Sequence, residues 1–260
     1  MCLLVFAFKT HPSYKLILAA NRDEFYERPT APAEFWDDAP NLLAGKDLKA
    51  GGTWLGITRN GRISAITNYR DPSSLKENAP SRGWIVNNYL LGSESPDDYL
   101  KKARKIAGRY NGFNLVLGDH ERLYWYSNRS EEYRRLSAGI YGLSNHLLDT
   151  PWPKISLSKG TLANLISKGK RPSPETLFRL LEDRTVPDDS RLPSTGVGIE
   201  WERILSPVFI VSSNYGTRSS TLLLIDRHDH VSFYERTFSP PENYVTDSNY
   251  EFDIEPLNIS

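Results

Sequence analysis

The feature that most constrains the fold of this chain is a run of six apolar residues, Leu3 to Phe8, near its beginning. Six residues are too few for a membrane-spanning helix, which needs roughly 20. The run also lacks the charged leading region and the small-residue cleavage site of a secretory signal. A continuous apolar run of this length is typical of a β-strand that is buried on both faces. The sequence therefore predicts that the chain opens with a strand inside the core.

The residue before this strand, Cys2, is the only cysteine in the sequence, and Met1 is the only methionine. Removal of Met1 would leave an α-amine and a thiol on one residue, and enzymes with a terminal nucleophile use the amine to activate the attacking side chain. Because the unperturbed amine and thiol titrate near ~8 and ~8.5, a modest electrostatic effect would produce thiolate at neutral pH. The alternative is that Cys2 is a small buried hydrophobic residue.

Composition excludes several classes of function. The sequence has 32 basic and 32 acidic residues, so it offers no general electrostatic attraction for nucleic acid or anionic membranes. A single cysteine rules out an intramolecular disulfide and a zinc site built on several cysteines, and it fits a reducing compartment. For His228 and His230 we favour a solvated turn over a metal site. We expect a cytoplasmic protein without a membrane span, with a targeting role for the first strand in a eukaryotic host as the alternative.

Periodicity and turn residues predict strands near both ends of the chain and helices between them. An Asn-Gly turn signal at 59–62 separates two strands and is typical of a hairpin. One helix is predicted from Ser81, as N-cap, to Leu91, and another opens at Ser95. Further helices are predicted over 153–167 and 174–182, a surface loop over 183–195, and strands over 5–8, 16–20, 114–117, 123–126, 140–143, 220–225 and 231–236. This order predicts one α+β domain over residues 1–260, with two stacked antiparallel sheets and helices outside.

Polar motifs follow several of the predicted strands. The tetrapeptide Asn21-Arg22-Asp23-Glu24 follows the 16–20 strand. A cation there would lower the thiol pKa of Cys2, and a carboxylate would hold the α-ammonium. Such composition is also common in a solvated turn, which is the alternative interpretation.

Two asparagines, Asn68 and Asn145, also follow predicted strands. An asparagine amide that points at a carbonyl oxygen can stabilise the negative charge that develops during acyl transfer. Arg218 lies in a polar run before a late strand, where it is either a surface residue or a buried residue that orients the site. The glycines around Gly51 and Gly52 match no phosphate-binding motif and are better suited to a tight turn and close backbone approach.

Together these motifs resemble the NRDE family, the group related to transport and Golgi organisation protein 2. The resemblance spans essentially the whole chain and rests on several ordered motifs, namely Cys2, Asn21–Glu24, Gly51–Gly56, Asn68–Arg70, Gly142–Asn145, Pro151–Lys154 and Gly216–Ser220. It implies the four-layer αββα fold of N-terminal nucleophile hydrolases. It also implies links to lipid metabolism and haem trafficking in eukaryotic relatives.

A more distant similarity runs to bile-salt hydrolases and penicillin-type acylases and acyltransferases, which cleave or transfer at amides with an amino-terminal cysteine. By that similarity Cys2 resembles the nucleophile, Asn68 and Asn145 resemble the two oxyanion asparagines, and Arg218 resembles the late arginine of the site. The early Arg-x-x-Asp pair of those enzymes differs here, because the arginine and the acids are adjacent. The acidic role therefore falls to either Asp23 or Glu24.

We therefore expect a cysteine amidohydrolase or acyltransferase that acts on a small acyl or amide substrate and needs no cofactor. The expected catalytic residues are Cys2, Arg22, Asp23, Asn68, Asn145 and Arg218, and the expected substrate-binding residues are Asn21, Glu24, Trp54, Tyr69 and His146. The alternative is a non-catalytic protein that binds lipid, acyl groups or haem on the same scaffold, with His146 as the axial ligand. A purely structural role is less favoured, because the six tryptophans are spread along the chain as in core packing.

Overall fold

The computed structural model describes residues 2–167, 169–239 and 244–255, and over these residues the strands form two antiparallel sheets. The six-stranded sheet contains, in spatial order, β10 (Gly139–Leu143), β1 (Cys2–Phe8), β2 (Tyr14–Phe25), β11 (Tyr215–Asp226), β12 (His230–Ser239) and β13 (Tyr244–Asp253). The seven-stranded sheet contains β3 (Thr30–Trp36), β4 (Ala39–Asp47), β5 (Leu55–Thr58), β6 (Arg62–Asn68), β7 (Phe113–Asp119), β8 (Leu123–Ser127) and β9 (Tyr133–Arg135).

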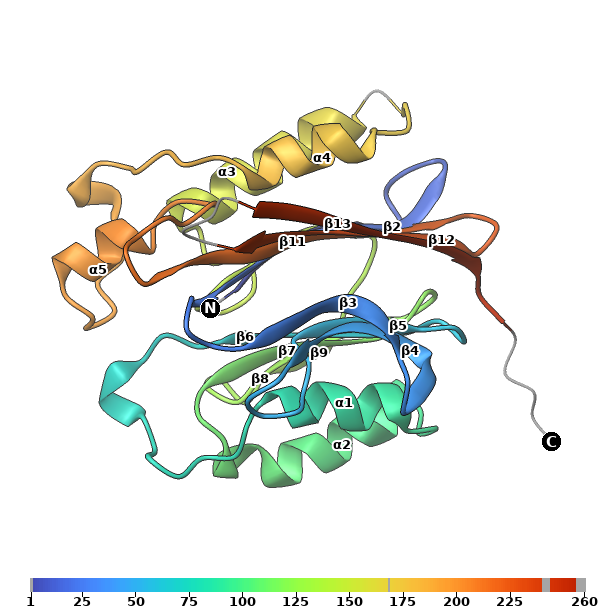
Figure 1. The fold of residues 1–260 in the computed structure, drawn as a ribbon, viewed down its shortest axis with the longest axis horizontal. Coiled ribbons are helices and arrows are strands. Elements are labelled where there is room, and N and C mark those ends of the chain that lie inside the picture. Colours follow the sequence, from blue (N-terminus) through green and yellow to red (C-terminus); the bar gives the residue numbers. More distant parts are fainter. Residues whose placement is uncertain (1, 168, 240–243, 256–260) are drawn as a thin grey trace.

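Helices cover the outer face of each sheet. Figure 1 shows α3 (Pro153–Ile166) and α4 (Pro174–Leu181) over the six-stranded sheet, and α1 (Gly83–Leu91) and α2 (Pro96–Ile106) over the seven-stranded sheet. A short helix, α5 (Ile199–Ile204), lies at one end of the sandwich, on the left in Figure 1. The fold is therefore the four-layer αββα sandwich of the α+β class that we predicted.

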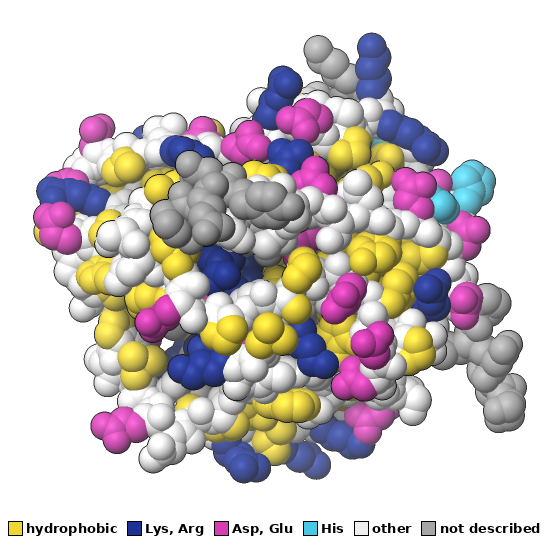
Figure 2. All heavy atoms as spheres, viewed as in Figure 1, with side chains coloured by type: hydrophobic (Ala, Val, Ile, Leu, Met, Phe, Trp, Pro, Cys, Tyr) yellow, Lys and Arg dark blue, Asp and Glu magenta, His cyan; other side chains and the backbone are white. Residues whose placement is uncertain are grey.

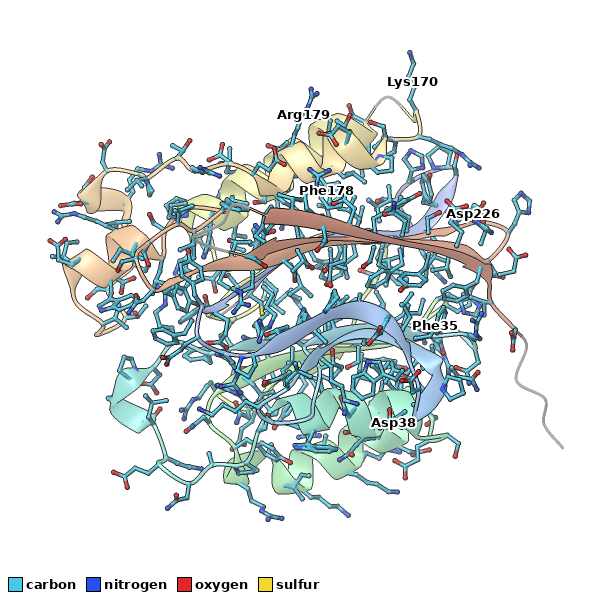
Figure 3. All side chains as sticks on the ribbon, viewed as in Figure 1. Phe35, Asp38, Lys170, Phe178, Arg179 and Asp226 are labelled. Carbon is cyan, nitrogen blue, oxygen red and sulfur yellow. The ribbon has the colours of Figure 1, made fainter. Side chains whose placement is uncertain are left out.

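Burial on two faces explains the continuous apolar sequence of the first strand. Alternate side chains of β1, such as Leu4 and Phe6, pack in the core between the two sheets. The intervening side chains, Val5 and Ala7, pack against the layer formed by α3 and α4. Figure 3 shows side chains filling both spaces, with Phe178 of α4 over the six-stranded sheet. Every residue of β1 is buried, as the opening run predicts.

Several predicted elements are confirmed. The Asn-Gly signal forms the turn between β5 and β6, which pair antiparallel. Ser95 caps α2, because its Oγ accepts a hydrogen bond from the N–H of Asp98 at 3.2 Å. Figure 2 shows basic and acidic side chains interspersed over the face in view, in line with the balanced composition. None of the helices in the described residues combines the length and the hydropathy needed to cross a bilayer.

Other predicted boundaries are wrong. The strand predicted over 16–20 continues through Asn21–Glu24 to Phe25, and β11 begins at Tyr215, because these two segments pair with each other across the sheet. These two polar motifs therefore lie within strands, whereas Asn145 follows β10 as predicted. Ser81 is not the cap of α1: that position belongs to Arg82, which has helical backbone angles and gives no side-chain cap. The pairs β3–β4 and β12–β13 and the helix α5 extend the predicted set.

The glycine-rich loop after β4 makes the close backbone approach that we expected. A Cβ added at Gly52 would lie 2.9 Å from the carbonyl carbon of Gly83, at the start of α1. The N–H of Thr53 donates to Oδ1 of Asn87 at 3.0 Å, so α1 holds the loop by side-chain contact as well. The loop and the first turn of α1 are therefore packed as one unit.

We expect Gly52→Ala to destabilise the protein by about 1–3 kcal/mol, because the new methyl group must displace the backbone of Gly83. The free energy of unfolding in denaturant measures this. Gly160→Ala is the matched control, since a Cβ at that exposed helical position meets nothing within 4 Å and should stabilise α3 by up to about 1 kcal/mol. Equal stability of Gly52→Ala and the wild type would show that the loop does not depend on this contact.

Candidate active site

Cys2 lies at the first position of β1 and lines a cavity of about 300 Å³. It pairs with Arg22 on β2, and its carbonyl accepts a hydrogen bond from Oγ of Ser144 at 3.2 Å. Burial raises the pKa of the Cys2 thiol, and this effect exceeds the lowering contributed by Arg22. Burial therefore acts against the thiolate that we expected at neutral pH. Met1 lies outside the described residues.

Arg22 on β2 lines the same cavity, and only 5% of the residue is exposed. Its guanidinium lies 4.2 Å from the ring centroid of Trp54, and Nη1 donates to Oγ1 of Thr30 at 3.1 Å. Stacking on an indole favours the cation at a desolvated position. Arg22 and Trp54 thus form a rigid, positively charged wall beside the thiol.

Asp23 also lines the cavity and is 1% exposed. Its Oδ1 accepts a hydrogen bond from Oγ1 of Thr217 at 2.8 Å. Burial raises the pKa of this carboxyl group, and the positive charge of Lys154 opposes that rise. Glu24 is more exposed, and its Oε1 accepts the N–H of Phe25. Of the two acids, Asp23 has the buried and fixed position that suits an acid within the site.

Lys154 is a charged residue of the site to which the sequence analysis gave no role, although its motif contributed to the family resemblance. It is 4% exposed on α3, and Nζ donates to the carbonyl of Leu205 at 2.9 Å. Burial lowers its pKa to about 8, and attraction to Asp23 opposes this effect. A buried cation therefore lies in the electrostatic field of Asp23 and Cys2.

The two predicted asparagines are neighbours but have different surroundings. Asn68 ends β6 and lines the Cys2 cavity. Asn145 is fully buried, and its Nδ2 donates to the carbonyl of Asn68 at 3.0 Å. Its own carbonyl accepts the N–H of Arg70 at 2.8 Å. Asn145 thus fixes the backbone of the cavity-lining asparagine.

An ion pair buried beside this segment attaches α5 to the site. Nη1 of Arg70 lies 2.6 Å from Oε2 of Glu202, and both side chains are 4% exposed. Glu202 also accepts the N–H and the hydroxyl of Thr195 through Oε1. Removal of one partner of such a pair usually costs about 3–5 kcal/mol, because a buried charge is left uncompensated.

The remaining predicted residues point elsewhere. Asn21 faces the helical layer, where Nδ2 donates to the carbonyls of Leu181 and Val208. Arg218 occupies a register shift in β11 and donates to the carbonyls of Phe25, Tyr26 and Arg28, and it does not line the Cys2 cavity.

The ring of His146 packs between other aromatic rings. Its centroid lies 4.9 Å from that of Tyr69 and 5.7 Å from that of Trp152, and Nδ1 bonds to Oγ1 of Thr150. Neither His146 nor Tyr69 lines the Cys2 cavity. These contacts make His146 a poor starting point for the haem-binding alternative.

One group of potential metal ligands, His120, Glu121 and Asp229, occurs in the described residues, away from Cys2. Nζ of Lys15 already lies 2.7 Å from Glu121 and 2.6 Å from Asp229. The ammonium group therefore takes the place that a metal ion would need. His230, for which we favoured a solvated turn over a metal site, bonds through Nδ1 to Asp253 at 2.7 Å.

We expect Lys154→Met to remove a rise in stability with pH. Lysine titrates near ~10.4 in an unfolded chain and at about 8 here. Between these values the unfolded state holds a proton that the native state lacks, so the free energy of unfolding increases with pH. The wild type should gain up to about 1.4 kcal/mol per pH unit relative to the variant over this range. Denaturant unfolding at several pH values measures the difference, with exposed Lys101→Met as control. If the free energies of unfolding of the wild type and Lys154→Met change with pH in parallel, the pKa of Lys154 is not lowered in the native state.

Comparison with known proteins gives the chain's family. A family model described as Transport and Golgi organisation 2 matches residues 1–240. The Transport and Golgi organization protein 2 homolog of Bos taurus is 36% identical over 277 residues, which cover 98% of this chain and 100% of the relative. The Homo sapiens homolog is 35% identical over 276 residues, with 98% and 100% covered. The Drosophila melanogaster protein is 29% identical over 267 residues, with 92% and 93% covered.

Two solved structures share a distant likeness with the chain. The Caenorhabditis elegans N-acylethanolamine-hydrolyzing acid amidase ortholog has a TM-score of 0.47 and 12% identity, with 86% of this chain and 92% of that chain covered. The C2A mutant of conjugated bile acid hydrolase from Clostridium perfringens has a TM-score of 0.41 and 8% identity, with 98% and 89% covered. The family model and the full-length relatives carry the assignment: this chain belongs to the Transport and Golgi organisation 2 family.

Proposed function

We propose that this chain is a cysteine-dependent amidohydrolase or acyltransferase for a small acyl substrate, with Cys2 as nucleophile after removal of Met1. The observation that carries the proposal is the cavity of about 300 Å³ that is lined by Cys2 together with Arg22, Asp23 and Asn68. Such a cavity combines a nucleophile, two charged groups and an amide donor at the beginning of a buried strand. A lone cysteine sealed in a core would lack these neighbours.

The raised pKa of Cys2 defines what the chemistry needs. A protonated thiol is a weak nucleophile, so a base must remove its proton during attack. The α-amine of a mature Cys2 would be on the same residue and titrates near ~8. Asp23, fixed by Thr217, then serves as the acidic partner that orients this amine.

The proposed reaction has two steps, which are the formation and the cleavage of an acyl thioester on Cys2. Sγ of Cys2 attacks the substrate carbonyl, the α-amine accepts the thiol proton, and the carbonyl π electrons move to oxygen. The side-chain amide of Asn68 stabilises this oxyanion. The C–N bond then breaks, the α-ammonium protonates the leaving amine, and an acyl thioester forms. Water, or a second amine in acyl transfer, then attacks the thioester carbonyl and gives a proton to the α-amine. The C–S bond breaks, the acid or the new amide is released, and the α-ammonium returns the proton to the Cys2 thiolate.

We expect an acylating thiol probe to modify Cys2 only in molecules that have lost Met1. In those molecules the amine is free to accept the thiol proton, so acylation should exceed that of the urea-unfolded protein by roughly 100-fold, the usual scale of base catalysis. Intact-mass spectrometry resolves the two species in one sample and reports the acylation of each.

Cys2→Ala provides the control, because Cys2 is the only cysteine in the sequence. Loss of labelling in this variant assigns the signal to the thiol. Complete retention of Met1 in protein from the native host, or labelling that persists in Cys2→Ala, would sink the mechanism.

A further inference from the structure

The carboxylates that line the Cys2 cavity are already engaged. Nη2 of Arg28 lies 2.6 Å from Oδ2 of Asp47, and Nε lies 3.1 Å from the same oxygen. Oε2 of Glu24 lies 3.9 Å from Nε of Arg28. Asp23 accepts from Thr217 and lies in the field of Lys154. The negative side chains of the cavity therefore have cations or donors of their own.

Two guanidinium groups that line the same cavity, those of Arg22 and Arg82, form no ion pair within the described residues. Nη1 of Arg82 donates to the carbonyl of Gly112 at 3.0 Å, and the side chain is half-buried. A guanidinium has five N–H donors, so one contact leaves most of its donors available. Burial lowers the pKa of Arg82, and attraction to Glu24 opposes this effect only in part. An anionic ligand would offset the remaining cost of burying the cation.

The shape and polarity of the cavity limit the ligand further. Its volume is about 300 Å³, and its large apolar side chains are those of Trp54 and Ile66. A larger cavity of about 1040 Å³, lined by Phe209, Phe238 and other apolar side chains, does not include Cys2. The space beside the thiol therefore suits a compact polar molecule better than a long hydrocarbon chain.

We propose that the substrate of this site is a small acyl compound that carries a carboxylate, and that Arg82 is the residue that binds it. A guanidinium binds a carboxylate through two parallel hydrogen bonds, which fix orientation as well as charge. Arg22, on β2 of the six-stranded sheet, adds positive potential to the cavity. Arg82 is the residue just before α1, the helix that covers the other sheet. This inference rests on the proposed function, because it names the substrate class of the same site.

Two matched pairs of thioesters test the proposal by the rate at which they acylate Cys2, followed by intact-mass spectrometry. The first pair differs on the acyl side, with succinyl against succinamoyl. The second differs on the leaving group, with 3-mercaptopropionate against 3-mercaptopropionamide. Each rate is divided by the rate for the urea-unfolded protein, which removes the intrinsic reactivity of the probe. We expect the carboxylate member of at least one pair to react roughly 10- to 100-fold faster, the scale of one charged hydrogen-bonded contact.

Arg82→Met should abolish that preference, so that the two members of the pair react at equal normalised rates. Arg82→Lys should retain part of it, because the charge stays but the paired donors are lost. Arg109→Met is the matched control, since Arg109 is exposed and does not line the cavity. It removes the same net charge and should leave the preference intact. Thermal unfolding of each variant verifies that it folds.

The outcomes separate this inference from the proposed function. Efficient acylation by both members of each pair at equal rates would overturn the carboxylate preference while the nucleophilic role of Cys2 stands. A preference that survives in Arg82→Met, or that disappears in Arg109→Met, would overturn the role of Arg82. Failure of all four probes to acylate native Cys2 would overturn both.

Discussion

The hydrogen bonds of the Ser144–Asn145 segment are the constraint on which the rest of the site depends. Ser144 donates to the carbonyl of Cys2 in one sheet, and its own carbonyl accepts the hydroxyl of Thr67 in the other. Asn145 donates to the carbonyl of Asn68. Apolar packing between the sheets has no directional preference, so these buried polar bonds fix how the two strand ends meet. These polar contacts hold the two sheets together at the edge where Cys2 and Asn68 line the cavity.

The charged side chains of β2 and α3 complement this arrangement. Alternation along β2 places the side chains of Arg22 and Asp23 on different faces of the strand. Asp23 lies in the electrostatic field of Lys154 on α3. Adjacent residues of opposite charge thus act on opposite sides of one strand. An ionised carboxylate at the Asp23 position needs compensation, because desolvation disfavours it, and α3 brings the cation that supplies it. The helix is therefore part of the electrostatics of the site as well as of the core.

Much of the fold could be predicted from local sequence patterns. The opening apolar run, the Asn-Gly hairpin and the Ser95 cap each depend on near neighbours, and each is present in the structure. The β3–β4 pair escaped prediction because its sequence is interrupted by prolines and acids, and it forms through pairing within the sheet. The site was predictable where a motif ends or forms part of a strand, as for Cys2 and Asn68. Arg82 escaped, because it reaches the cavity only through the docking of α1 against a distant loop.

The register shift at Arg218 determines more than the position of one arginine. In β11, Thr217 lies opposite Asp23 and Ser219 opposite Arg22, so Arg218 is an extra residue in the ladder. A bulge leaves the extra residue outside the ladder, while the residues on either side keep their partners on the neighbouring strand. Thr217 therefore stays opposite Asp23, where its hydroxyl donates to the carboxylate. Arg218, free of the ladder, donates instead to the carbonyls of Phe25, Tyr26 and Arg28, so the bulge fastens the chain where β2 ends and turns toward the other sheet.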